Sequence, residues 1–148
     1  MIIKRTWDID DIRSVLCHPE IYPCIAGDGC PEAKDFILPL QGNEYYGGYV
    51  NDEIISVMIY HASKDRQYCH IQVLPKYRKE YAREFAKGTL NEQLKNGPIF
   101  AEIPECYPNV LRFALGVGFE VIETTDEPYI RDGKSCEIKV LRCENGIC

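Results

Sequence analysis

Residues 66–95, RQYCHIQVLPKYRKEYAREFAKGTLNEQLK, decide the fold of this chain. Residues 68–74 are rich in aromatic and β-branched side chains and stop at Pro75, which has no N–H for a sheet ladder, so they predict a strand. Beyond the proline, apolar side chains recur at helical spacing and predict an amphipathic helix. They are Tyr81, Ala82, Phe85, Ala86, Leu90 and Leu94. A strand that leads into a helix start predicts an anion site, because the first-turn N–H groups have no partner inside the helix.

The expected start of this helix is crowded with cations. They are Lys76, Arg78, Lys79 and Arg83. A helix start normally favours acidic side chains, because the helix dipole is positive there. Lys79, Arg83 and Lys87 also repeat about one turn apart, where like charges cost roughly 0.2–0.5 kcal/mol per pair. Two interpretations stay open: a phosphate-binding cluster, or a solvated basic face that Glu80 and Glu84 partly offset.

Length and charge limit the classes of protein to which this chain can belong. The 148 residues predict one domain, residues 1–148, with a sizeable core. The net charge of −6, from 17 basic and 23 acidic residues, argues against a nucleic-acid or anionic-membrane partner. No apolar run approaches the ~20 residues that span a membrane. We expect no signal peptide, because a strand pattern begins directly after Met1, and we therefore expect a cytoplasmic protein.

The cysteines do not have the spacing of a metal site. There are eight, at positions 17, 24, 30, 69, 106, 136, 143 and 148, and none forms a Cys-x-x-Cys pair. The three histidines are scattered along the chain. We therefore predict no metal ion and reduced thiols, with Cys148 exposed at the end of the chain.

The remaining segments complete an α+β order. Strands are expected at residues 2–7, 45–50, 54–60, 99–103, 119–123 and 137–141, with turns at 51–53 and 132–133. Helices are expected after an N-cap at Asp8 and from Pro108 to about Gly116. Residues 17–42, rich in Pro and Gly, are expected to be irregular, with one helical turn near 32–36. This order predicts a central mixed, mostly antiparallel sheet with helices on both faces.

Three of these features resemble the GNAT superfamily of acyl-CoA-dependent N-acyltransferases. Residues 73–78, VLPKYR, are similar to the strand end, proline and arginine that open its acetyl-CoA pyrophosphate loop. The second feature is the helix that follows. The third is LRFA at 111–114 leading to GFE at 118–120, similar to the late helix and Gly-Phe strand entry. Residues 70–82 also resemble a narrower, phage-borne group of GNAT-like proteins, some of which are labelled head-assembly or virion proteins.

The resemblance implies a direct acyl transfer from acetyl-CoA to a small-molecule or protein amine. It implies that two strands splay apart to hold the cosubstrate. The cofactor-binding residues would be Gln72, Val73, Leu74, Arg78, Lys79, Tyr81, Ala82 and Arg83. The base that removes the proton of the amine would be Glu102 or His70. Glu102 lies between Ala101 and Ile103 and is expected to be partly buried with a raised pKa, or else to be a salt-bridged structural residue. His70 is alternatively a hydrogen-bonded sheet residue.

The chain also departs from the superfamily pattern. Tyr81 and Arg83 stand where the pyrophosphate loop has small residues, and Ala114 stands where a tyrosine often protonates the departing thiolate. Tyr107 or Tyr129 is a candidate substitute. A second hypothesis therefore remains: a GNAT-fold protein without turnover or cofactor, located in a host cytoplasm or a virion and bound to phage virion proteins or a host target. The sequence leaves the acceptor and the oligomeric state open.

Overall fold

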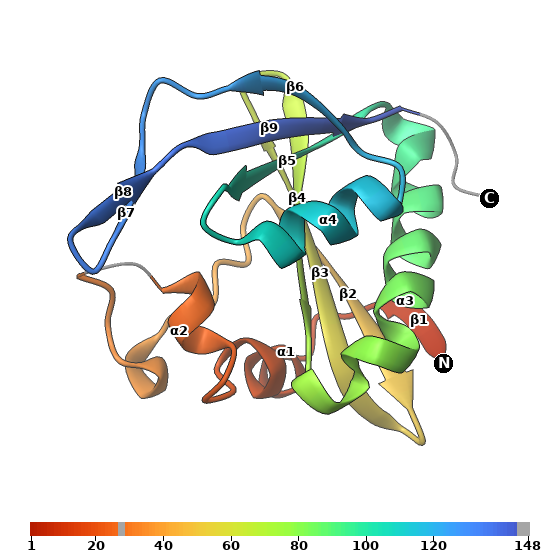
Figure 1. The fold of residues 1–148 in the computed structure, drawn as a ribbon. Helices are drawn as coiled ribbons and strands as arrows, with labels where there is room; N and C mark the ends of the chain where they lie inside the picture. The colour runs from red at the N-terminus through yellow and green to blue at the C-terminus, as the bar shows by residue number, and fades with distance from the viewer. Residues whose placement is uncertain (27–28, 145–148) are drawn as a thin grey trace.

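The computed structural model describes residues 1–26 and 29–144. They form a seven-stranded sheet in the order β1-β2-β3-β4-β5-β9-β6, and β7 and β8 form a separate hairpin (Figure 1). The strands are β1 (Ile2–Arg5), β2 (Asn43–Val50), β3 (Glu53–Ser63), β4 (Arg66–Val73), β5 (Ile99–Pro104), β6 (Glu120–Thr124), β7 (Tyr129–Arg131), β8 (Lys134–Cys136) and β9 (Ile138–Cys143). Among the described strands, β4 and β5 alone pair in parallel. The predicted mixed, mostly antiparallel sheet is confirmed.

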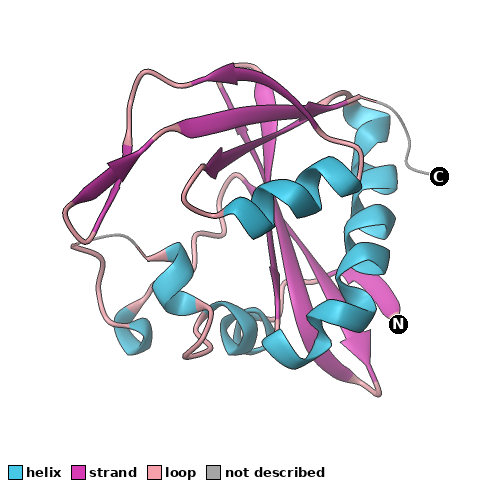
Figure 2. Ribbon diagram, in the orientation of Figure 1, coloured by secondary structure: helices cyan, strands magenta, loops and turns pink. Residues whose placement is uncertain are grey.

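Helices cover both faces of this sheet, as predicted (Figure 2). The helices are α1 (Ile9–Leu16), α2 (Tyr22–Ile25), α3 (Arg78–Gln93) and α4 (Pro108–Gly116), with 3-10 turns at Ala33–Asp35, Pro75–Tyr77 and Leu94–Asn96. One core cluster joins Phe85 and Leu90 of α3 and Ala114 of α4 to the sheet. The other joins Ile12 and Val15 of α1 to the opposite face. Burial of the apolar side chains of these two clusters, from helices and strands together, stabilises the fold.

Two tight turns build the central meander of β2, β3 and β4. Asn51 and Asp52 have φ angles of 51° and 65°, and Lys64 and Asp65 have φ angles of 50° and 63°. Two-residue hairpin loops with both residues in the left-handed region twist in the same sense as the strands they join. The predicted meander is therefore confirmed, with strands somewhat longer than expected.

Two short elements were missed. Residues 17–42 contain the expected turn at Ala33–Asp35, but also α2, whose Pro23 lies in its first turn, where proline is compatible with a helix. In a segment rich in Pro and Gly, this proline was expected to belong to irregular structure. The turn at Asp132-Gly133 is confirmed, but the three-residue strands β7 and β8 on either side of it were too short to show an alternating pattern. They form the hairpin that extends away from the main sheet in Figure 1.

Candidate functional site

Strands β4 and β5 start side by side and then diverge (Figure 1). Within the described residues their parallel pairing comprises two positions, Gln67 with Ile99 and Tyr68 with Phe100. Beyond these positions β4 stays paired with β3, and β5 stays paired with β9. One edge of β4 after Tyr68 therefore faces a V-shaped opening.

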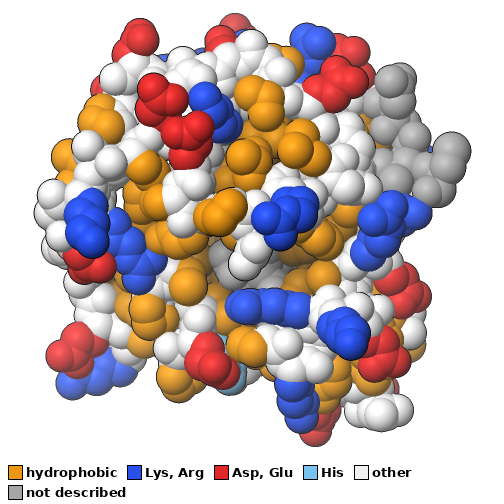
Figure 3. Space-filling model, viewed as in Figure 1, with side chains coloured by type: hydrophobic (Ala, Val, Ile, Leu, Met, Phe, Trp, Pro, Cys, Tyr) orange, Lys and Arg blue, Asp and Glu red, His pale blue; other side chains and the backbone are white. Residues whose placement is uncertain are grey.

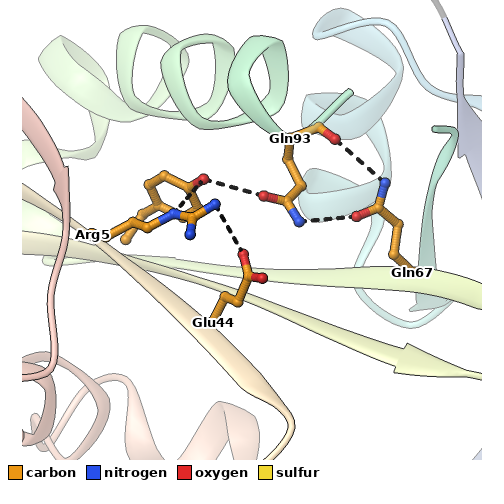
Figure 4. Close-up of polar contacts among 5 residues, drawn as sticks. Arg5, Glu44, Gln67 and Gln93 are labelled. Atoms are coloured by element: carbon orange, nitrogen blue, oxygen red, sulfur yellow. Dashed lines mark hydrogen bonds and ion pairs between the residues drawn. The ribbon is translucent and has the colours of Figure 1, made fainter. Parts of the chain in front are cut away.

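A partly buried polar network fixes the closed end of this opening (Figure 4). Gln67 at the branch point donates to the carbonyl of Gly97 at 2.9 Å, and its side-chain oxygen accepts from Gln93 Nε2 at 3.0 Å. Gln93, near the end of α3, in turn accepts from Tyr46 Oη at 3.1 Å, and Arg5 Nε donates to Tyr46 Oη at 3.3 Å. These bonds join β1, β2 and β4 to the C-terminal end of α3, so the branch point is held rigidly.

The backbone of β4 presents hydrogen-bonding groups to the opening. The N–H of Leu74 donates to the carbonyl of Ile55 at 2.9 Å, so Leu74 faces β3. Backbone groups alternate between the two edges of a strand, so Gln72 also faces β3, whereas the carbonyl of Cys69 and the backbone groups of Ile71 and Val73 face the opening. The N–H of Cys69 takes part in the pairing of Tyr68 with Phe100. Of the three predicted strand contacts, Val73 alone presents its backbone there. Cys69 and Ile71 were missed because their orientation depends on the register with β3.

Backbone N–H groups at the start of α3 that were expected to be free are hydrogen-bonded within the chain. Tyr77 N–H donates to the carbonyl of Leu74 at 2.9 Å, and Arg78 N–H donates to the carbonyl of Pro75. Arg78 Nε folds back onto the carbonyl of Val73 at 2.9 Å. Two of the amides and part of the arginine that were expected to meet phosphate are therefore used within the chain. In the described residues Tyr77, the N-cap of α3, has no side-chain capping bond.

Cationic side chains nevertheless remain free beside this helix start. Lys79 and Arg83 are exposed, and within the described residues neither makes a hydrogen bond or an ion pair. Arg83 extends towards α4, since a Cβ added at Gly116 would lie 3.7 Å from its Nη1. Tyr81 and Ala82 are half-buried, and the Tyr81 ring lies 6.1 Å from that of Tyr77. In Figure 3 the surface is hollowed between α4 and the start of α3, and Lys and Arg side chains line the rim.

Both predicted bases, His70 and Glu102, lie beside the opening, on the face of the sheet against which α1 packs. The rings of Tyr68 and Phe100 lie 5.9 Å apart on this face. Side chains alternate along a strand, so His70 and Glu102, two residues further on, project to the same face from the two diverging strands. Glu102 is exposed rather than partly buried, because its neighbours in β5 point into the core instead. Within the described residues Glu102 makes no hydrogen bond or ion pair, so nothing supports a salt-bridged role.

His70 forms a pair with His61 of β3. Their Nε2 atoms lie 2.9 Å apart, and the ring centroids are 5.0 Å apart with planes 6° from parallel. This centroid separation is close to the largest possible for two imidazole rings whose Nε2 atoms are 2.9 Å apart, so the rings lie edge to edge. One Nε2 can then donate a hydrogen bond to the other. His70 is exposed at the surface, but desolvation by the atoms packed around the imidazole, and then the proximity of His61, lower the pKa of His70 to about 4. The sequence analysis missed His61. The two-residue turn at Lys64-Asp65 would have placed it beside Tyr68, diagonal to His70.

A cavity of about 360 Å³ adjoins Glu102 on the same face. Its lining comprises Lys64, Arg66, Tyr68, Glu102, Glu123, Thr125 and Val140. Arg66 pairs with Glu123 at 2.9 Å and lies 4.4 Å from the centre of the Phe100 ring. The cavity is therefore aromatic on one wall and contains one paired and one unpaired carboxylate.

Comparison with known proteins identifies the fold. No protein-family model and no curated protein sequence matches this chain. Solved structures do match it. The protein smu.2055 of Streptococcus mutans aligns with a TM-score of 0.75 and 13% identity, over 96% of this chain and 98% of that one. A point mutant of spermidine N-acetyltransferase from Vibrio cholerae aligns with a TM-score of 0.73 and 10% identity, over 97% and 94% of the two chains. The ribosomal-protein-S18-alanine N-acetyltransferase of Escherichia coli aligns with a TM-score of 0.71 and 14% identity, over 96% and 92%.

The chain has the GNAT acyltransferase fold. At these identities the likeness concerns the fold alone, and the chemistry has to be argued from this chain's own residues.

Ala114, at the position where GNAT proteins often have a tyrosine, is buried in this chain. Ala114 is 7% exposed and packs in the core. The suggested substitutes come together elsewhere: Tyr107 Oη lies 3.2 Å from Tyr129 Oη, and Arg131 Nη1 donates to Tyr107 Oη. Burial, and then Tyr107, raise the pKa of Tyr129. Tyr107 is the N-cap of α4 and precedes Ala114 by seven residues, which is roughly 10 Å along a helix.

Three further expectations concern metals, membranes and thiols. Among residues 1–26 and 29–144, no group of three His, Cys, Asp or Glu side chains is placed to hold a metal ion. No helix in the same residues has the length and apolar character needed to cross a membrane. The seven described cysteines are all free thiols. Cys148 lies outside the described residues.

Proposed function

We propose that this protein is a GNAT-type N-acyltransferase that transfers an acyl group from acetyl-CoA or another acyl-CoA directly to an amine. The observation that carries the proposal is the divergence of β4 and β5 beyond Tyr68 and Phe100. It leaves unpaired backbone along one wall of the opening, and it places His70 and Glu102 at its mouth.

The residues beside the opening suit an acyl-CoA, although Arg78 differs from the role that the resemblance implies. The carbonyl of Cys69 and the backbone groups of Ile71 would bind the amides of the pantetheine arm, and the unpaired cations Lys79 and Arg83 would bind the phosphates. Arg78 would contribute less than the resemblance implies, because its Nε already bonds to Val73. When bound, acetyl-CoA would supply an acyl group activated as a thioester.

Glu102 is the residue that we propose as the base. Its carboxylate is exposed at the cavity and unpaired within the described residues, so it is free to accept the proton of an amine, directly or through water. His70 is less suited to this role, because its Nε2 is engaged with His61. We assign to the histidine pair the orientation of the amine or of a bridging water. The acceptor would be a small-molecule or protein amine that fits the cavity of about 360 Å³.

A second candidate is a GNAT-fold protein that binds without turnover, such as a phage head-assembly or virion component. Specific observations favour it. The amides of Tyr77 and Arg78 are already bonded within the chain, and Ala114 is buried where a proton donor is common. The resemblance of residues 70–82 to phage-borne proteins supports the same candidate.

Thermal unfolding with acetyl-CoA, followed by turnover on a panel of amines, separates the two candidates. At ~100 times its Kd a ligand stabilises a protein by about 2.7 kcal/mol, which for this size raises the Tm by roughly 5–10 °C. Lys79→Ala should reduce the shift, whereas Lys134→Ala, an exposed lysine on the β7–β8 hairpin, should not. A shift with turnover supports the acyltransferase, a shift without turnover on any amine supports the second candidate, and no shift at millimolar acetyl-CoA contradicts the acyltransferase.

A further inference from the structure

Two cysteines that are 30 residues apart in the sequence meet beside α4. Cys106 lies in the turn between β5 and α4, and Cys136 is the last residue of β8. Their Sγ atoms are 2.9 Å apart. The two cysteines lie just beyond the last paired residues of β5 and β9. There Glu105 N–H donates to the carbonyl of Glu137 at 2.8 Å and so extends the pairing of these strands. The next residues on the two strands are the two cysteines, so backbone hydrogen bonding fixes their separation.

The same place holds the β7–β8 hairpin against the start of α4. Tyr129 is the register partner of Cys136, and its hydroxyl lies 3.2 Å from that of Tyr107. Tyr107 follows Cys106 directly and is the N-cap of α4. A covalent bond between the cysteines would therefore join the hairpin to the helix at a point where noncovalent contacts already join them.

We propose that Cys106 and Cys136 are a reversible disulfide site that locks the β7–β8 hairpin to the start of α4 under oxidising conditions. The sulfurs lie about 1 Å beyond bonded distance, so the bond needs little movement of the backbone. This proposal does not rest on the proposed acyl transfer.

The chemistry is thiol–disulfide exchange with a small disulfide such as oxidised glutathione. The thiolate of the exposed Cys106 attacks one sulfur of glutathione disulfide and releases one glutathione thiolate. The thiolate of Cys136 then attacks the Cys106 sulfur of the mixed disulfide and releases the second glutathione. One protein disulfide forms, one glutathione disulfide is reduced to two thiols, and the two cysteine protons pass to the two departing glutathione thiolates.

The other described cysteines are poorer candidates. Cys143 is buried, and burial raises the pKa of Cys69 to about 12, so little reactive thiolate forms there. Cys24 and Cys30 are exposed and serve as internal controls for general thiol reactivity. The bond between the two thiols also raises the pKa of Cys106, so exchange should accelerate as the pH increases.

The test oxidises the full chain with glutathione disulfide, alkylates the remaining thiols and maps peptides without reduction. We expect a cross-linked peptide pair containing Cys106 and Cys136, lost on reduction, and a rise in Tm of up to about 10 °C for the oxidised protein. Cys106→Ser and Cys136→Ser should each abolish both signals, and Cys24→Ser should retain them. Glutathione adducts on Cys24 and Cys106 without the cross-link, or a cross-link that leaves the Tm unchanged, would overturn the proposal.

Discussion

Replacement of Glu102 by glutamine tests the proposed base while leaving its surroundings almost unchanged. The side chain is exposed and unpaired within the described residues, so its removal should change the free energy of unfolding by no more than about 0.5 kcal/mol. A positioned general base contributes about 100- to 10,000-fold to the rate, which is about 3–5 kcal/mol of transition-state stabilisation. Glu102→Gln should therefore lose most activity at an unchanged Tm and with an unchanged affinity for acetyl-CoA.

The assay measures kcat/KM for the best amine found in the panel, with Tm measured on the same samples. The matched control is Glu120→Gln, an exposed carboxylate on β6 that does not line the cavity. It should retain activity within about twofold. If Glu102→Gln keeps wild-type kcat/KM, Glu102 is not the base. If both variants lose activity equally, the effect is one of overall charge, and the assignment also fails.

Three further predictions follow from the contacts around β4. Arg78→Ala should lower the free energy of unfolding of the ligand-free protein by about 1–3 kcal/mol in urea denaturation, because the carbonyl of Val73 loses its donor. Lys79→Ala should leave that free energy unchanged but raise the Kd of acetyl-CoA about threefold to tenfold at low salt, with a smaller effect at high salt in calorimetric titrations. His70 has a lowered pKa, so the unfolded state binds more protons, and stability should fall as the pH drops from about 6.5 to about 4. Urea titrations across this range should show a smaller fall for His70→Asn, and an equal fall would contradict the lowered pKa.

Local chemistry was enough to predict most of the fold. The strand that stops at Pro75, the helix stripe behind it and the two-residue turns each follow from nearby residues, and each is confirmed. The helix α2 was missed because Pro23 is compatible with both a break and a first helical turn. The strands β7 and β8 were missed because three residues carry too little alternation to separate a strand from a loop.

The site was less predictable, because it depends on register. The sequence identified His70 and Glu102, but their common face follows from the pairing of Tyr68 with Phe100. The same is true of His61, whose contact with His70 crosses two strands. The backbone bond of Arg78 had no signal in the sequence, since an arginine near a helix start suits a phosphate and a carbonyl equally.

Amide hydrogen exchange along β4, followed by NMR with and without acetyl-CoA, tests the central claim most directly. The claim is that the open edge of this strand binds the acyl-CoA. We predict that the amides of Ile71 and Val73 become protected when acetyl-CoA is added, whereas the amide of Leu74, already bonded to Ile55, changes little. Unchanged exchange at Ile71 and Val73 with saturating acetyl-CoA would contradict the claim.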